Sequence, residues 1–210
     1  KIEKLRDLLS PQIVLVSVMY ANNEIGAIQP IVEIAKIIRR ARKDFNSVTP
    51  YFHIDACQAP RFLPLQVNKL GVDLMTINSS KLYSPRGAGL LFVRRGVPLK
   101  PLLVGGGQEK GRRAGTENHK VIREFVQALI WAQKSKNKEG KDLTKLRDYF
   151  IKRVLVEIPD AHLNGGLIER LPNNINLSFP GILGEQIVLA LDAKGIAVST
   201  GSACAIPKQD

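Results

Sequence analysis

The sequence IVLVSVMYANN, residues 13–23, decides the fold class. Its apolar, largely β-branched part predicts a buried strand over residues 13–21, which ends at Asn22-Asn23. Pro30 then opens an amphipathic segment, because isoleucines share one helical face at residues 31, 34, 37 and 38. The sequence therefore predicts a strand, a loop and a helix in succession.

Three further apolar runs continue this pattern, over Tyr51–Asp55, Val72–Ile77 and Ala88–Arg94. Short apolar strands that alternate with helices are typical of a mostly parallel sheet covered by helices on both faces. We therefore expect an α/β fold. Ligands of such sheets bind at the carboxyl ends of the strands.

The second half of the chain predicts longer helices, over Val121–Gln133 and Leu143–Ile158, separated by a Lys-rich polar stretch around residues 134–141. We expect the domain boundary in that stretch. Residues 1–133 would then belong to a large cofactor-binding domain, and residues 134–210 to a smaller α+β domain. In the smaller domain we expect a strand, a helix and a second strand, over residues 174–179, 184–194 and 196–199.

Charge and cysteine content narrow the class of protein. The 31 Lys and Arg residues exceed the 19 Asp and Glu residues, but they are scattered without interleaved aromatics, so we do not expect direct nucleic-acid binding. The two cysteines form no disulfide framework, and no apolar run reaches the length of a membrane span. We expect a cytoplasmic protein with no membrane partner. Because Lys1 is neither Met nor part of a signal peptide, we expect the natural start upstream.

Lys81 directly follows a predicted strand, which would aim its amine into the ligand-binding crevice. A lysine in such a place forms a Schiff base when its pKa is lowered, although a lone lysine after a strand is more often a surface residue. Asp55 ends the preceding strand and suits the ring nitrogen of pyridoxal 5'-phosphate, which must stay protonated. Gln58 and Asn23 add hydrogen-bond donors at the same strand ends. Each polar residue alone fits a turn or a helix cap, and their joint occurrence favours the cofactor.

Two donor-rich segments suit a phosphate group. Asn78, Ser79 and Ser80 precede Lys81, and a glycine-rich loop covers residues 105–116. The loop does not have the spacing of a nucleotide-binding P-loop.

Cys204 lies in a Gly/Ser/Ala segment, where we expect its thiol to be exposed, as a reactive cysteine requires. Cys57 lies inside a strand-to-helix turn, where we expect an inert, packed thiol.

Taken together, these motifs resemble those of cysteine desulfurases in the class V branch of the fold-type I pyridoxal-phosphate enzymes, the group that includes bacterial and mitochondrial housekeeping enzymes. The resemblance covers essentially the whole chain. It rests on five strings in this order: residues 21–26, residues 53–58, Lys81 with Tyr83, Pro85 and Gly87, residues 105–118, and residues 199–204.

The resemblance implies roles for individual residues. Lys81 would bind the cofactor covalently, Asp55 would pair with the pyridine nitrogen, and Gln58 and Asn23 would contact the ring oxygen or the substrate. Thr116 would bind the phosphate of the neighbouring subunit, which implies a homodimer.

The resemblance also implies a reaction. Cys204 would attack the sulfur of bound L-cysteine, giving alanine and an enzyme persulfide. The sulfur would pass to an iron-sulfur scaffold or to a sulfur-carrier protein for tRNA thiolation. In a eukaryote the compartment would be the mitochondrion.

The sequence departs from the family in two respects. Ser80 stands where the family commonly has a His that helps to move protons, and Asn78 stands where a Ser is common. The family's phosphate-binding turn and ring-stacking His would lie upstream of Lys1, and its substrate-carboxylate Arg downstream of Asp210. We therefore expect a truncation at both ends, and we expect the 210-residue segment alone to be inactive.

Two alternative functions remain open, and a third, that of an ordinary transaminase, fits less well. A selenocysteine lyase uses the same scaffold with a cysteine in a similar place. An ordinary transaminase has no need of an exposed thiol at Cys204. A non-catalytic remnant would bind a sulfur-transfer partner through the basic surface.

Overall fold

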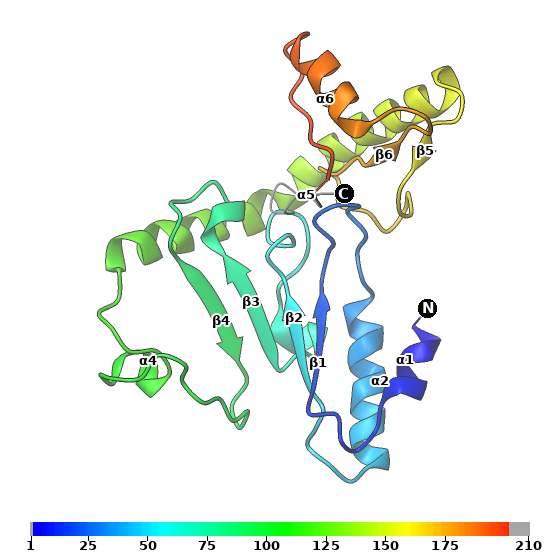
Figure 1. The fold of residues 1–210 in the computed structure, drawn as a ribbon. Helices are drawn as coiled ribbons and strands as arrows, with labels where there is room; N and C mark the ends of the chain where they lie inside the picture. Colours follow the sequence, from blue (N-terminus) through cyan, green and yellow to red (C-terminus); the bar gives the residue numbers. More distant parts are fainter. Residues whose placement is uncertain (1, 202–210) are drawn as a thin grey trace. The chain divides into compact units, whose positions relative to one another are not determined.

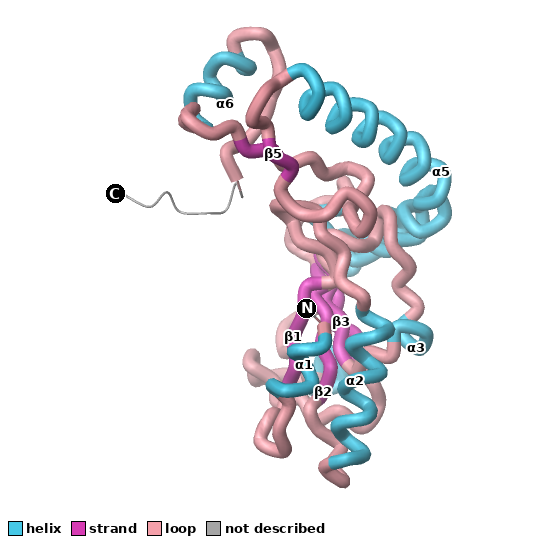
Figure 2. The backbone as a smooth tube through the Cα atoms, turned by 90° about the vertical axis from the view of Figure 1, so that its right-hand side faces the viewer, coloured by secondary structure: helices cyan, strands magenta, loops and turns pink. Residues whose placement is uncertain are grey.

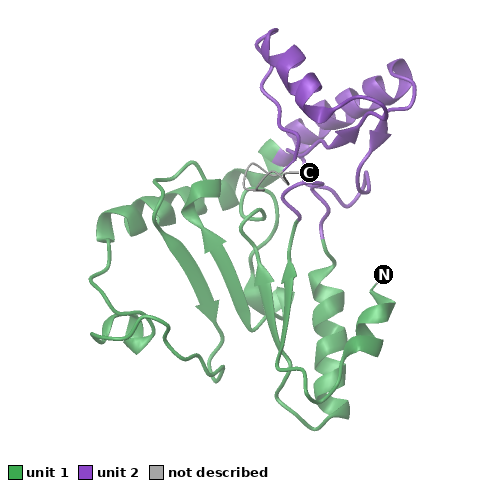
Figure 3. Ribbon diagram, in the orientation of Figure 1, with its two compact units in different colours: residues 1–21, 29–139 green, residues 22–28, 140–210 purple. Residues whose placement is uncertain are grey.

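The computed structural model describes residues 2–201 (Figure 1), so Cys204 lies outside the described residues. The chain divides into two compact units, which Figure 3 colours separately. Unit 1 contains the described residues up to Ala21 together with Gln29–Glu139. Unit 2 contains Asn22–Ile28 together with the described residues from Gly140 onward.

Unit 1 is built on a four-stranded sheet with the strand order β1-β2-β3-β4. Its strands are β1 (Leu15–Met19), β2 (Tyr51–Asp55), β3 (Leu74–Asn78) and β4 (Gly89–Val93). The pairs β1–β2 and β2–β3 are parallel, and β4 runs antiparallel to β3. The predicted α/β fold with a mostly parallel sheet is therefore confirmed, and each predicted strand of this half overlaps an observed one.

Helix α2 (Ile31–Asp44) buries the face that the isoleucine spacing predicts. Its buried side chains are Ile31, Ile34, Ala35, Ile38 and Ala41. Figure 2 shows α2 and α3 on the same side of the sheet. The shorter helices of unit 1 are α1 (Glu3–Leu8), α3 (Val67–Leu70), the 3-10 turn η1 (Ser79–Lys81) and α4 (Gln108–Gly111).

Helix α5 (His119–Glu157) is continuous over 39 residues, so the predicted break between two helices is wrong. The polar stretch contains several lysines, which are good helix formers, and α5 contains no proline. Gly140 costs the helix about 1 kcal/mol, which packing at either side offsets. Phe125 and Ala132 are buried before this point, and Ile151 is buried after it. Within residues 2–201, none of the helices combines the length and apolar composition that a membrane crossing requires.

Unit 2 contains the second half of α5, the short antiparallel pair β5 (His162–Leu163) and β6 (Leu177–Ser178), and α6 (Gly184–Asp192). The predicted strand over residues 174–179 is therefore reduced to the two residues of β6. The strand predicted over residues 196–199 is wrong, because this exposed segment pairs with no other strand among the described residues. A β-branched run forms a strand only where a neighbour completes its hydrogen bonds.

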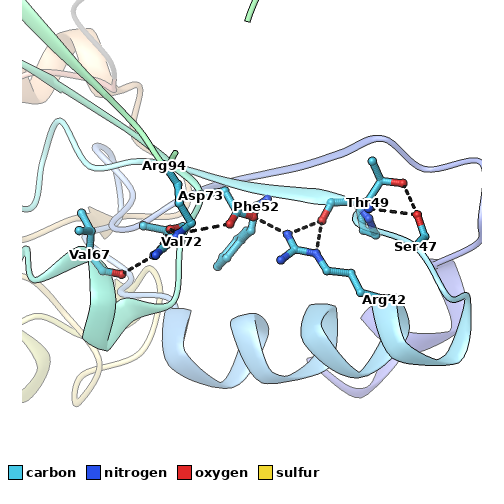
Figure 4. A network of polar contacts seen from close by, with 9 residues as sticks. Arg42, Ser47, Thr49, Phe52, Val67, Val72, Asp73 and Arg94 are labelled. Atoms are coloured by element: carbon cyan, nitrogen blue, oxygen red, sulfur yellow. Dashed lines mark hydrogen bonds and ion pairs between the residues drawn. The ribbon is translucent and has the colours of Figure 1, made fainter. Parts of the chain in front are cut away.

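Asp73 ties the amino end of β3 to α2 and to the end of β4 (Figure 4). Its buried carboxylate accepts a hydrogen bond from the Phe52 N–H (2.8 Å) and forms ion pairs with Arg42 and with Arg94 (3.5 Å). Arg42 Nε also donates to the Pro50 carbonyl at 2.9 Å. One carboxylate therefore satisfies groups from three segments of the core.

Replacing Asp73 with Ala leaves two arginines without their anion, and we expect unfolding to become easier by about 3–5 kcal/mol. The control is Asp44→Ala, which breaks an ion pair with Arg40 whose side chains are 71% and 54% exposed. Exposed pairs contribute at most about 1 kcal/mol. Urea unfolding monitored by circular dichroism measures both changes. Equal effects of the two substitutions would contradict the structural role of Asp73.

Candidate functional site

The carboxyl ends of β2 and β3 lie side by side. Asp55 is the last residue of β2 and pairs with Thr76 in the parallel register, so Asn78 at the end of β3 is nearby. The chain then turns directly into η1, which ends at Lys81. The edge of the sheet therefore carries a carboxylate and an amine on neighbouring segments.

Cys57 shows how closely these groups approach one another. Its N–H donates to Asp55 Oδ1 at 2.9 Å. The pKa of the Cys57 thiol is raised to about 12, mainly by burial and in addition by the hydrogen bond to Asp55 and the charge of Asp55. A backbone contact with Asn78 and the positive charge of Lys81 act in the opposite direction on this pKa. The thiol therefore lies within the electrostatic reach of both the acid and the amine.

A row of polar side chains crosses the same face of the sheet one pleat before Asp55. His53 joins Ser17 on β1 and Thr76 on β3, with 2.7 Å from each ring nitrogen to a hydroxyl oxygen. Burial lowers the pKa of His53, and the negative charge of Asp55 partly opposes this change. Sequence reasoning did not find this row. The signal was the alternation of β2, in which His53 and Asp55 share a face.

Hydrogen bonds within the chain hold the segment around Lys81. The buried Ser79 hydroxyl donates to the Pro85 carbonyl at 2.8 Å and accepts from the Ala88 N–H at 3.4 Å. Ser80 donates to Asn78 Oδ1 at 2.7 Å. The hydroxyls proposed to bind phosphate therefore have acceptors within the chain, and the phosphate role of Asn78, Ser79 and Ser80 stays a prediction.

The other predicted site residues are spread over both units. Gln58 is half-buried and follows Cys57 directly, at the edge that carries Asp55. Thr116 is exposed in the loop between α4 and α5 of unit 1, whereas the exposed Asn23 belongs to unit 2. Cys204, the predicted reactive thiol, lies outside the described residues.

The turn that carries Asn23 is fixed within unit 2. Asn22 Oδ1 accepts hydrogen bonds from the N–H groups of Glu24 (2.9 Å) and Ile25 (2.8 Å). The Glu24 carbonyl accepts from Asn174 Nδ2 at 2.8 Å, and Asn174 in turn accepts from the buried Arg170 at 2.9 Å. The conformation of this turn therefore depends on the loop around Arg170.

Comparison with known proteins shows which family the chain resembles. The model of the family "Aminotransferase class-V" matches residues 1–210. A protein named cysteine desulfurase IscS from Dictyoglomus turgidum is 46% identical over 202 residues, which are 96% of this chain and 50% of that protein. The protein of the same name from Methanosarcina thermophila is 45% identical, over 96% of this chain and 48% of its own length. The chain thus spans about half the length of the curated relatives it matches.

Solved structures agree with this result. A NifS-like protein superposes with a TM-score of 0.88 at 36% identity, over 95% of this chain and 53% of its own. A NifS-like protein from Rickettsia africae superposes with a TM-score of 0.85 at 30% identity, over 96% of this chain and 55% of its own. The fold of this chain is therefore that of the fold-type I pyridoxal-phosphate enzymes, as predicted.

The geometry of the Asn22–Ile28 turn predicts that Gly26→Ala destabilises the protein. Gly26 has a φ of +68°, and an added Cβ would lie 2.6 Å from Asn174 Oδ1. The matched control is Gly181→Ala, because Gly181 has a φ of +81° but nothing within 4 Å of an added Cβ. We expect the control to lower the free energy of unfolding by about 1–2 kcal/mol, and Gly26→Ala to lower it by about 1–3 kcal/mol more. Thermal unfolding compares them, and equal losses would show that the turn tolerates the methyl group.

The raised pKa of Cys57 predicts a thiol that resists alkylation in the folded protein. At pH 8 a thiol with a pKa of about 12 has roughly a thousandfold less thiolate than a thiol with the ordinary pKa of 9.0. Iodoacetamide should therefore modify Cys57 far more slowly in buffer than in urea, where burial is lost. Peptide mass spectrometry measures both rates. Similar rates in the two solvents would show that the folded environment does not hold the proton.

Proposed function

Because the chain belongs to the class V aminotransferase family, we propose that it acts as a pyridoxal-phosphate-dependent cysteine desulfurase. The observation that carries the proposal is that Asp55, which accepts a hydrogen bond from Cys57, and the turn that ends at Lys81 lie at the adjoining ends of β2 and β3. The names of the curated relatives support the choice of reaction within the family. They favour L-cysteine over selenocysteine as the substrate.

The residues at this edge fit the chemical groups of pyridoxal phosphate. Lys81 supplies the amine for covalent attachment, and Asp55 supplies a carboxylate for the ring nitrogen. Gln58 supplies a donor for the ring oxygen or the substrate, and the resemblance to cysteine desulfurases assigns the same role to Asn23 of unit 2. The phosphate would be held by donors from Asn78, Ser79 and Ser80, and by Thr116 of the neighbouring subunit in a homodimer. When bound, the cofactor supplies an electron sink for the substrate amino acid.

Each of these side chains has a defined task in the proposed reaction. Asp55 keeps a proton on the ring nitrogen, because an adjacent anion stabilises the protonated ring. Lys81 Nζ binds the cofactor and can exchange protons with the substrate. Ser80 donates a hydrogen bond but does not titrate near neutrality, so it does not replace the proton-moving His of the family.

Cys204 is the proposed sulfur acceptor. In the balanced reaction, L-cysteine and the Cys204 thiol give L-alanine and a persulfide on Cys204. The bond between the substrate sulfur and its carbon breaks, and a sulfur–sulfur bond forms. The sulfur then passes to an iron-sulfur scaffold or to a sulfur-carrier protein, in the cytoplasm or in the mitochondrion of a eukaryote.

Two substitutions in the full-length protein distinguish cofactor binding by Lys81 from sulfur acceptance by Cys204. Lys81→Ala should abolish the cofactor adduct that borohydride traps, and with it alanine release. Cys204→Ser should keep the adduct but form no persulfide when L-cysteine is added. Mass spectrometry of peptides detects both products, and Cys57→Ser is the control that should keep both.

Two outcomes would contradict the proposal. A borohydride-trapped adduct that persists in Lys81→Ala would refute the assignment of Lys81 as the lysine that binds the cofactor. A persulfide that forms on Cys57 while Cys204 stays unmodified would refute the choice of thiol.

A further inference from the structure

Arg61 links the turn after β2 to the segment that carries Lys81. Its Nη1 donates to the hydroxyl of Tyr83 at 2.7 Å. The same guanidinium lies over the Tyr83 ring, with 4.5 Å from Cζ to the ring centroid. Tyr83 is thus held through both its hydroxyl and its ring face, only two residues after Lys81.

Arg61 also binds α5. Its Nη2 forms an ion pair with Glu139, and the two side chains are only 15% and 22% exposed. The backbone on either side of Arg61 is also attached to α5. Gln133 Nε2 on α5 donates to the carbonyls of Pro60 (2.6 Å) and Leu63 (3.0 Å). The residues around Arg61 are therefore fixed to the long helix at two points.

The backbone of Tyr83 requires such external support. Its φ of +55° lies in the left-handed region, which is unfavourable for a bulky side chain. The Tyr83 side chain is itself 82% exposed, so burial does not hold this conformation. The contacts from Arg61 restrain it, while the hydrogen bond from Ser79 to Pro85 restrains the other end of the same loop.

The Arg61–Glu139 pair is not optimised for stability alone. Arg61 Nε and Glu139 Oε2 are both buried and have no hydrogen-bond partner within the part of the chain that the structure describes. A buried ion pair with unsatisfied atoms contributes little net stability and serves better to specify one arrangement. The arrangement specified here is that of Arg61, and through it Tyr83, relative to Glu139 on α5.

We propose that Arg61 is a positioning residue for Lys81. It fixes the backbone that carries the Lys81 amine by clamping Tyr83 to α5 through Glu139. This inference rests on the proposed function, in which Lys81 binds the cofactor. Arginine is required because its planar fork can stack on the ring, donate to the hydroxyl and pair with the carboxylate at once. A lysine in its place can pair with Glu139 but cannot make all three contacts.

The test uses two variants that should both fold. Arg61→Lys keeps the ion pair with Glu139, and Tyr83→Phe keeps the ring on which the guanidinium stacks. The first measurement is amide hydrogen exchange over residues 81–88 without cofactor. We expect roughly tenfold faster exchange in Arg61→Lys, the size of effect that losing one hydrogen bond and one cation–π contact gives. The second is the rate at which added pyridoxal phosphate forms the borohydride-trapped adduct at Lys81, which should fall by about the same factor.

Arg153 provides the matched control. It donates to the Tyr149 hydroxyl at 2.7 Å, lies 5.7 Å from that ring and pairs with Glu157, but all of these contacts are made along α5 in unit 2. Arg153→Lys should therefore change neither measurement. Unchanged exchange and unchanged adduct formation in Arg61→Lys would overturn the inference. If the unaltered protein forms no adduct, the proposed function fails, whereas the exchange over residues 81–88 still decides whether Arg61 holds the loop.

Discussion

The parallel pairing of β2 with β3 is the constraint on which the candidate site depends. Parallel strands end at the same edge of a sheet, so the pairing of Asp55 with Thr76 brings the end of β2 beside the turn into Lys81. An antiparallel arrangement would separate them by the length of a strand. The antiparallel strand β4 contributes differently, because the N–H of Ala88, just before β4, donates to the Ser79 hydroxyl and closes the loop that carries Lys81.

Two acidic residues on these strands show how surroundings decide between structure and chemistry. Asp73 precedes β3 and is 5% exposed, and it is held by two arginines and the N–H of Phe52. Both oxygens of Asp73 already bind groups of the protein core. Asp55 lies at the opposite end of the strands, where it is half-buried and contacts Cys57. A half-buried carboxylate that pairs with no arginine among the described residues can still bind a ligand. This favours Asp55 over Asp73 as the proposed partner of the ring nitrogen.

Local sequence patterns predicted what depends on near neighbours. The four strands of unit 1 and helix α2 follow from apolar runs and from isoleucine spacing, and Lys81 follows from its place after a strand. Patterns failed where distant residues decide the outcome. The continuity of α5 depends on packing at both ends, and the strand predicted over residues 196–199 has no pairing partner among the described residues. Arg61 stayed hidden because its partners are far away in sequence, at Tyr83 and Glu139.

The two cysteines illustrate a chemical requirement of the proposed reaction. A thiol near Asp55 and Lys81 would compete for the substrate if it ionised, because thiolates are the reactive form. Burial and the contact with Asp55 keep the Cys57 proton in place by raising its pKa to about 12. The same carboxylate can therefore serve the cofactor and suppress a side reaction. The proposed sulfur acceptor is therefore a different thiol, that of Cys204, which lies in a Gly/Ser/Ala segment far from Asp55 along the sequence.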